Sequence, residues 1–202
     1  MGNIDNLNDR LGSGEVVIID GGTGTEIPRR GVSLCPDTWS GRANLTHPDV
    51  IRQIHEDYIS VGAEVIITNT FWTSRKGLEK GNLGSKTFEI NNIAVKLAIE
   101  ARKNVKSDRE IFIAGSMSTC FPMSDPNVIP SYKEALENYR EQAQILAESG
   151  IDFFVLEMLV RTLDARAAAQ AASEVGLPIW VGYSITESAD GVLYLGLRED
   201  KH

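Results

Sequence analysis

The sequence is short of cysteine, of basic charge and of long apolar runs, and each shortage excludes a class of protein. Its 202 residues hold two cysteines, Cys35 and Cys120, which are too few for a disulfide framework. The 20 Lys and Arg are outnumbered by 28 Asp and Glu, and the net charge of −8 disfavours nucleic acid, which selects for a basic surface. No apolar run approaches the roughly 18 residues of a membrane span, and the first residues lack a signal-peptide profile. We therefore expect a cytoplasmic globular protein with reduced thiols and no membrane or nucleic-acid partner.

What the sequence does have is a regular alternation of short apolar segments with amphipathic ones. The apolar segments are continuous rather than alternating, which is typical of parallel strands buried on both faces. The predicted strands are Val16–Asp20, Glu64–Thr70, Ile111–Gly115, Asp152–Glu157 and Pro178–Ser184. The predicted helices are Asp49–Val61, Phe88–Val105, a segment from Ser131 to Ser149, and Thr162–Val175. The pattern predicts an α/β fold with a parallel sheet.

Capping signals support these boundaries. Thr46 followed by Asp49, and Ser131 followed by Glu134, each have the spacing of a capping box. Three helices end in a glycine directly before the next apolar segment, in the phrases SVGAEVII, ESGIDFFV and EVGLPIWV.

Periodicity alone leaves two architectures open. Because the strands start about every 40 residues, eight such units would need on the order of 320 residues, within the usual range of a (β/α)8 barrel. This chain has room for about five units. It is therefore either a complete open sheet or part of a barrel.

The densest chemical signal is the glycine-rich segment DGGTGTE, which starts at Asp20 and follows the first predicted strand. It lacks the third glycine of a dinucleotide fingerprint and the Gly-Lys of a Walker loop. It is then either a tight turn or a backbone cradle for a carboxylate or phosphate, with Asp20 beside it.

Polar residues also follow the predicted strands, where parallel α/β folds place their active sites. They include Asp20, Asn69, Thr70, Ser116 and Glu157. Glu157 ends a strongly apolar strand, and a buried carboxylate requires a partner. Asp20 and Glu157 at one mouth would suit a ligand ammonium group, and the alternative is that each forms a structural ion pair, for instance with Arg161.

Aromatic and metal-binding residues carry less information. Trp39 and Trp72 follow the first two strands and either wall a pocket or cover the sheet end. His47 lies in the capping segment before the first predicted helix and His55 lies within that helix, and solvated or packing roles are expected for both. Cys35 and Cys120 are single, and no set of three or four zinc ligands is evident.

At these residues the sequence resembles the homocysteine S-methyltransferase family, which includes betaine–homocysteine methyltransferase and the homocysteine-binding module of methionine synthase. The shared segments are DGGTGTEI, THPDVIRQIHEDYISVGAEVIITNTFWTS, GSMS and DFFVLEML, in this order between about residues 15 and 190. The resemblance implies a (β/α)8 TIM barrel of which this chain carries about the first five βα units. It implies one homocysteine-binding domain over residues 1–202 that is incomplete at its C-terminal end.

The resemblance also implies roles for individual residues. Asp20 and Glu157 match acidic positions that hold the homocysteine amino group, and Gly21 and Gly22 match backbone positions near its carboxylate. The remaining matches would line the mouth of the site: Trp39, Asn69, Thr70, Trp72 and Ser116. The implied reaction moves a methyl group from a small donor to the homocysteine thiol and gives methionine.

The metal half of the family's site has no match here. The resemblance implies a zinc ion on three cysteines, in Asn-Cys and Gly-Gly-Cys-Cys contexts after the fifth strand, and neither context occurs in this sequence. We therefore assign no metal ligand, and expect this chain alone to bind no stoichiometric zinc and to form no methionine. An alternative is a non-catalytic half-barrel module that self-associates through its open edges. A metal-independent lyase or aldolase is disfavoured because no predicted strand ends in lysine.

Overall fold

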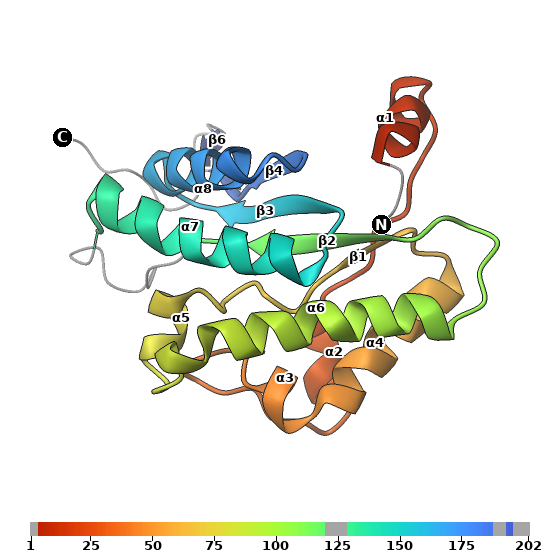
Figure 1. The fold of residues 1–202 in the computed structure, drawn as a ribbon, viewed down its shortest axis with the longest axis horizontal. Coiled ribbons are helices and arrows are strands. Elements are labelled where there is room, and N and C mark those ends of the chain that lie inside the picture. Colours follow the sequence, from red (N-terminus) through yellow and green to blue (C-terminus); the bar gives the residue numbers. More distant parts are fainter. Residues whose placement is uncertain (1–3, 120–128, 188–192, 196–202) are drawn as a thin grey trace.

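A four-stranded parallel sheet forms the centre of the molecule in the computed structural model, which describes residues 4–119, 129–187 and 193–195 (Figure 1). The strands are β1 (Val65–Ile67), β2 (Phe112–Met117), β3 (Phe153–Leu159) and β4 (Ile179–Tyr183), in the order β1-β2-β3-β4. The long crossover helices are α4 (Pro48–Val61), α6 (Thr87–Asn104), α7 (Tyr132–Ser149) and α8 (Thr162–Val175). Each of these four strands and four helices was predicted from the sequence to within a few residues.

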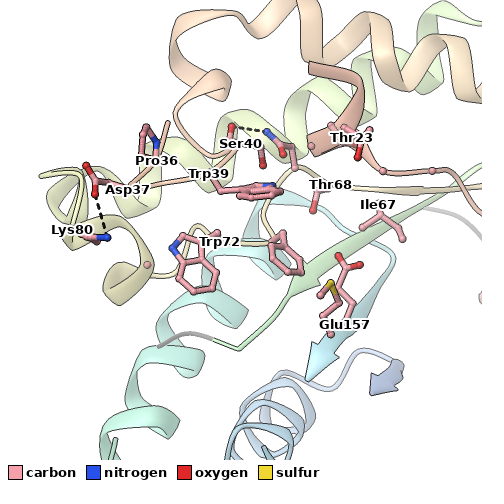
Figure 2. Close-up of a pocket in the computed structure, with 18 of the residues that line it drawn as sticks. Thr23, Pro36, Asp37, Trp39, Ser40, Ile67, Thr68, Trp72, Lys80 and Glu157 are labelled. Carbon is pink, nitrogen blue, oxygen red and sulfur yellow. Dashed lines mark hydrogen bonds and ion pairs between the residues drawn. The ribbon is translucent and has the colours of Figure 1, made fainter. Parts of the chain in front are cut away.

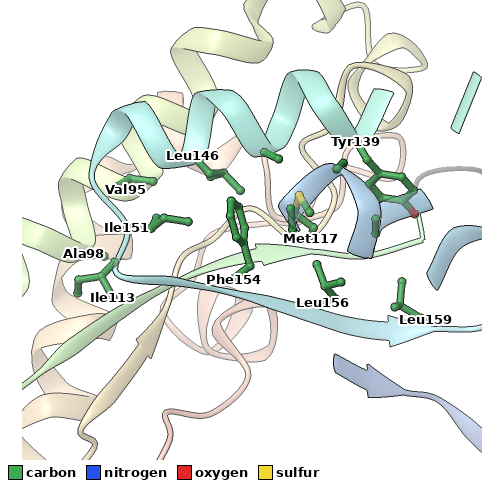
Figure 3. Close-up of a cluster of buried hydrophobic side chains, with 14 of the residues drawn as sticks. Val95, Ala98, Ile113, Met117, Tyr139, Leu146, Ile151, Phe154, Leu156 and Leu159 are labelled. Carbon is green, nitrogen blue, oxygen red and sulfur yellow. The ribbon is translucent and has the colours of Figure 1, made fainter. Parts of the chain in front are cut away.

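The helices pack side by side in chain order and cover one face of the sheet, α4 against α6, α6 against α7 and α7 against α8. The main core lies between them and the strands, where Phe154 and Leu156 meet helical side chains such as Leu146 and Tyr139 (Figure 3). The opposite face is covered near the start of the strands by Leu7 of α1 (Ile4–Gly12), a helix that the sequence analysis missed. The central strands are thus buried on both faces, as their continuous apolar runs predict.

The prediction of a first strand over Val16–Asp20 is wrong. Of Val16–Asp20, only an isolated parallel bridge between Ile19 and Val65 forms, although the Asp20 amide also donates to the Val65 carbonyl at 2.9 Å. Val16 and Ile18 are 77% and 52% exposed instead of buried. The physical reason is position, because this segment lies at the sheet edge with β1 on one side and no further strand of the described chain on the other.

The strand at the other edge of the sheet, β4, is also more exposed than the sequence predicts. Val181 and Tyr183 of β4 are each 46% exposed, since β4 pairs only with β3 within the described ranges. A short antiparallel pair, β5 (Ile185–Glu187) with β6 (Leu193–Leu195), follows it and was not predicted. The residues after Leu195 lie outside the described part of the chain.

Two capping predictions had opposite outcomes. Ser131 and Glu134 form a complete capping box at the start of α7, and Gly150 and Gly176 end α7 and α8 in the left-handed conformation. The Thr46 box is wrong, because Thr46 is the last residue of α3 (Ala43–Thr46) and its hydroxyl donates to the Arg42 carbonyl.

The short elements were missed. They are α2 (Thr23–Arg29), which starts directly after Gly22, α3, α5 (Arg75–Glu79) and the 3-10 turn Gly84–Lys86. None of the helices in the described residues has both the length and the apolar character needed to cross a bilayer.

Candidate substrate-binding site

A cavity of about 610 Å³ opens at the carboxyl-terminal ends of the strands (Figure 2). Its walls come from the segments 21–25, 36–40, 67–72 and 76–80, and from Glu157 and Met158 of β3. In Figure 2, Glu157 lies at one end beside Ile67, Lys80 and Asp37 lie at the other, and the rings of Trp39 and Trp72 stand between them. Parallel α/β folds place ligand sites at this end of the sheet.

Asp20 lies behind the acidic end of the cavity and is 8% exposed. Its Oδ2 accepts a 2.9 Å hydrogen bond from the Ile67 amide, whereas its buried Oδ1 has no hydrogen-bond partner. Burial raises the pKa of Asp20 to about 8, and repulsion from the nearby Glu157 carboxylate adds to the rise. One carboxylate oxygen is therefore available to a donor that the described residues do not supply.

Glu157 is aimed by an irregularity in its strand. The register of β3 against β4 shifts between Leu156 and Leu159, and Met158 has a φ of 50°. Such bulges redirect side chains next to functional sites. The Ser116 hydroxyl donates to Glu157 Oε1 at 2.5 Å, while burial raises the pKa of the Glu157 carboxyl.

The structural ion pair considered for Glu157 does not form. Arg161 Nε instead donates to Asp164 Oδ2 at 2.6 Å, at the start of α8. Within the described chain, neither Asp20 nor Glu157 is paired with a cation, and their two carboxyl groups lie close enough to repel each other.

Ser116 and Thr70 support the site from behind and do not line the cavity. Thr70 Oγ1 donates to the Ser116 carbonyl at 2.8 Å and lies 2.7 Å from Thr68 Oγ1. All three residues are buried, with exposures of 2% or less. This hydroxyl network joins the ends of β1 and β2 and fixes the residue that donates to Glu157.

Asn69 lines the cavity, but its side chain is engaged in the wall. Its Nδ2 donates to the Ser40 carbonyl at 3.1 Å and to Asn44 Oδ1 at 2.8 Å, while Asn44 Nδ2 donates back to the Asn69 carbonyl. These bonds tie the end of β1 to the segment that carries Trp39. The arrangement gives Asn69 a positioning role in the wall.

The two tryptophans form aromatic walls. Trp39 has a φ of 50° and is 53% exposed, with its indole against Gly24 so closely that a Cβ there would lie 2.6 Å from Nε1. Trp72 lies against Gly77 of α5. Non-glycine residues with positive φ are uncommon and cluster at functional sites.

The glycine-rich segment is both a turn and a wall. Gly21 and Gly22 line the cavity, and Gly22 precedes the first residue of α2 without a side-chain cap. Gly21 packs on the ring of Tyr58 from α4, where an added Cβ would lie 2.8 Å from the phenol oxygen. The close packing accounts for a glycine at this position.

The sequence reasoning missed part of the wall. Phe71 and Met158 adjoin predicted residues, so the strand-end rule could have found them. Lys76 lies in the unpredicted helix α5, and Lys80 directly follows it. Both lysines are in exposed ion pairs, Lys76 with Glu79 at 2.9 Å and Lys80 with Asp37 at 3.5 Å. Neither ends a strand, as an aldolase-type lysine would.

No group of three or more His, Cys, Asp or Glu among the described residues could hold a metal ion. Cys35 is a free thiol whose pKa is lowered chiefly by a hydrogen bond with Thr38. Cys120 lies outside the described ranges. The donor set for zinc is therefore missing from the part of the chain that is described.

The fold and the cavity define an α/β chain with an aromatic-walled, acidic-ended candidate site at the carboxyl end of a parallel sheet. The family model for homocysteine S-methyltransferase matches residues 17–196, and the chain belongs to this family. Selenocysteine methyltransferase of Astragalus bisulcatus is 28% identical, over 92% of this chain and 69% of that protein. Betaine–homocysteine S-methyltransferase 1 of Sus scrofa is 29% identical, over 85% of this chain and 60% of that protein.

The oxidised form of the homocysteine methyltransferase MmuM from Escherichia coli superposes with a TM-score of 0.75 at 22% identity. The match covers 88% of this chain and 66% of MmuM, which has also been solved in a metallated form. It confirms the predicted fold class, α/β of the (β/α)8 barrel type. This chain spans 58% to 69% of the length of the curated relatives compared with it.

Proposed function

We propose that this chain binds homocysteine in the cavity and serves the transfer of a methyl group from a small donor to the homocysteine thiol, yielding methionine. The observation that carries the proposal is the pair of carboxyl groups at the acidic end of the cavity, with Glu157 in its wall and Asp20 buried behind it. Asp20 Oδ1 is buried without a partner, and Glu157 is held towards the same end by Ser116. A primary ammonium group brings the donors that these oxygens lack.

The remaining atoms of homocysteine fit the walls beside this end. Its carboxylate would lie near the backbone of Gly21 and Gly22, which line the cavity, and its thiol would extend towards the aromatic walls. The volume of about 610 Å³ exceeds the need of one small amino acid and leaves room for a methyl donor. Names such as selenocysteine methyltransferase among the relatives support an amino acid with a soft nucleophilic side chain as the acceptor.

The thiol must ionise before it attacks, because the thiolate is the nucleophile and a free thiol has a pKa of about 8.5. The resemblance assigns this activation to zinc, and the described residues offer no matching donor set. We therefore propose that this chain supplies the amino-acid-binding part of the site. A cytoplasmic location, which keeps such thiols reduced, is part of the same proposal.

The test is calorimetric titration of the 202-residue chain with L-homocysteine and with 4-mercaptobutyrate, which has the same thiol and carboxylate but no amine. We expect homocysteine to bind and mercaptobutyrate to bind at least about tenfold more weakly, since charge-assisted hydrogen bonds are lost. Glu157→Gln should weaken homocysteine binding to a similar extent. Glu174→Gln, on the far surface of α8, should not.

Equal binding of the two ligands would contradict the amine assignment. Metal analysis and a methionine assay on the same preparation test the second half of the proposal, for which we expect no stoichiometric zinc and no methionine. One tightly held zinc per chain would overturn the account of the missing ligands.

A second candidate, a self-associating half-barrel module, is favoured by one observation. Both sheet edges expose apolar side chains, among them Val16 and Ile19 on one edge and Val181 and Tyr183 on the other. Unpaired edges of this kind are sites of chain association. Association and ligand binding are compatible, so the titration above also decides whether the module has a ligand.

A further inference from the structure

The acidic end of the cavity has an unusual balance of charge. Asp20 is almost fully buried with one oxygen unpartnered, and the Glu157 carboxylate lies near enough to repel it. Ser116 is the donor that the described chain gives to Glu157. Two ionised carboxylates facing each other in a site of low dielectric are unstable without a counter-charge. In the absence of a cation, such a pair retains a proton.

The neighbouring charged groups do not supply that counter-charge. Arg29 at the end of α2 pairs with Glu26 at 2.6 Å, and Arg30, which follows α2, pairs with Asp57 at 2.7 Å. From the segment before β1, Glu64 pairs with Arg10 at 2.6 Å.

The other groups near the acidic end of the cavity do not place a positive charge beside the two carboxyl groups. Tyr58 of α4 packs beneath Gly21, and its own pKa is raised chiefly by burial, with Glu26 and Asp20 adding to the rise. Lys80, which follows α5, stands at the opposite end of the cavity and pairs with Asp37 (Figure 2). Lys76 of α5 pairs with Glu79.

We propose that the empty site stores one proton on the Asp20–Glu157 pair and that the ammonium group of an incoming amino acid replaces it. On binding, the O–H bond of the carboxylic acid breaks, the proton leaves to solvent, and N–H groups of the ammonium donate to both carboxylates. The inference rests on the proposed function and deepens it, because it makes ligand uptake a proton-releasing exchange. The pKa of about 8 for Asp20 agrees with a proton that is held at neutral pH.

The exchange selects the class of ligand. A primary ammonium compensates the two negative charges and donates hydrogen bonds, whereas a neutral amide or a deaminated acid leaves the proton in place. Affinity for an ammonium ligand should therefore rise with pH, by up to about tenfold per pH unit while a full proton is released. The rise should level off once the pair is ionised before binding.

The experiment is titration calorimetry of the full chain at about pH 7 in buffers of different ionisation enthalpy, which counts the protons released. L-methionine is the main probe, because it carries the same ammonium as homocysteine but no thiol that could itself lose a proton. L-homocysteine is the second probe. We expect close to one proton released per methionine bound.

Asp20→Asn and Glu157→Gln are the matched variants, since each replaces a carboxyl by an amide of the same shape. We expect each to bind methionine at least about tenfold more weakly. Asp20→Asn should also release almost no proton, whereas Glu157→Gln keeps the buried Asp20 and can still release one. Glu174→Gln is the control and should release the same number as the unaltered chain. Circular dichroism melts show whether each variant is folded, and the two variants test the pair independently.

The outcomes separate the two proposals. Methionine and homocysteine that bind without proton release overturn the stored proton and leave the proposed function standing. Failure of both amino acids to bind overturns the proposed function, and the inference with it. Proton release that persists in folded Asp20→Asn also overturns the inference.

Discussion

At the scale of single residues, burial of the Asp20 carboxyl makes the stability of the fold depend on pH. The pKa of Asp20 is raised from 3.8 to about 8, mainly by burial. The stability associated with the protonated form is fully present below the unfolded pKa and is lost as pH rises through the folded pKa. The folded chain therefore becomes less stable between about pH 4 and pH 8 on account of this residue.

Asp20→Asn should remove that loss, because an amide does not ionise. We expect the free energy of unfolding of the variant to exceed that of the unaltered chain by a margin that grows from about pH 5 to pH 9. Denaturant titrations at several pH values measure it. A margin that stays constant with pH contradicts the assignment, and a gain in stability with a loss of binding is expected for a binding residue.

His55 makes the stability of the fold depend on pH in the acid range, as Asp20 does in the neutral and alkaline range. It is fully buried on α4, both ring nitrogens lack a hydrogen-bond partner among the described residues, and burial lowers its pKa to about 4. Stability from a group with a depressed pKa is present above the unfolded value and is lost as pH falls through the folded value.

We therefore expect the chain to lose up to about 3 kcal/mol of stability between about pH 6.5 and pH 4. His55→Leu should flatten this part of the profile, and His47→Gln, at an exposed position, should leave it as it is. An acid limb that is unchanged in His55→Leu assigns the loss to other groups.

At the scale of elements, the packing of the glycine segment on α4 shapes the acidic end of the cavity. Gly21→Ala places a Cβ 2.8 Å from the Tyr58 phenol oxygen, so we expect a loss of about 1–3 kcal/mol of stability and weaker ligand binding. Tyr58→Phe in the same chain removes that oxygen and should recover part of both losses. Chemical denaturation and calorimetry measure them.

Gly12→Ala is the matched control, because a Cβ at Gly12 meets nothing within 4 Å. Equal effects of the two alanine substitutions would show that Gly21 is not tightly packed against α4.

The long elements were predictable from sequence because their signals are local. Periodicity and a glycine cap predict a helix over Thr162–Val175, and the structure has a helix with the same bounds. The predicted capping box at Ser131 is also present in full. The helices α2 and α5 were not predictable from the sequence, because helices of 7 and 5 residues are stabilised by tertiary contacts rather than by their own sequence.

The sequence likewise predicts part of the candidate site. Parallel strands bring Asp20 and Glu157 to one end of the sheet, so their convergence follows from the fold. The positive φ of Trp39 and Met158, and the unpartnered oxygen of Asp20, arise from long-range packing that no local pattern encodes.

At the scale of the whole molecule, we expect the exposed sheet edges to govern self-association. The described sheet ends at the Ile19 bridge on one side and at β4 on the other, and both edges expose apolar side chains. We expect the isolated chain to self-associate at micromolar concentration, and Ile19→Lys with Val181→Lys to shift it towards monomer. Sedimentation velocity measures the shift, and a monomeric unaltered chain over the whole concentration range contradicts the prediction.

The most direct test of the central claim is a crystal structure of the chain with L-homocysteine bound. We predict that the ligand nitrogen lies within about 2.7–3.2 Å of Asp20 Oδ1 and of a Glu157 carboxylate oxygen, with the sulfur towards Trp39 and Trp72. A homocysteine whose nitrogen contacts neither carboxylate would contradict the account.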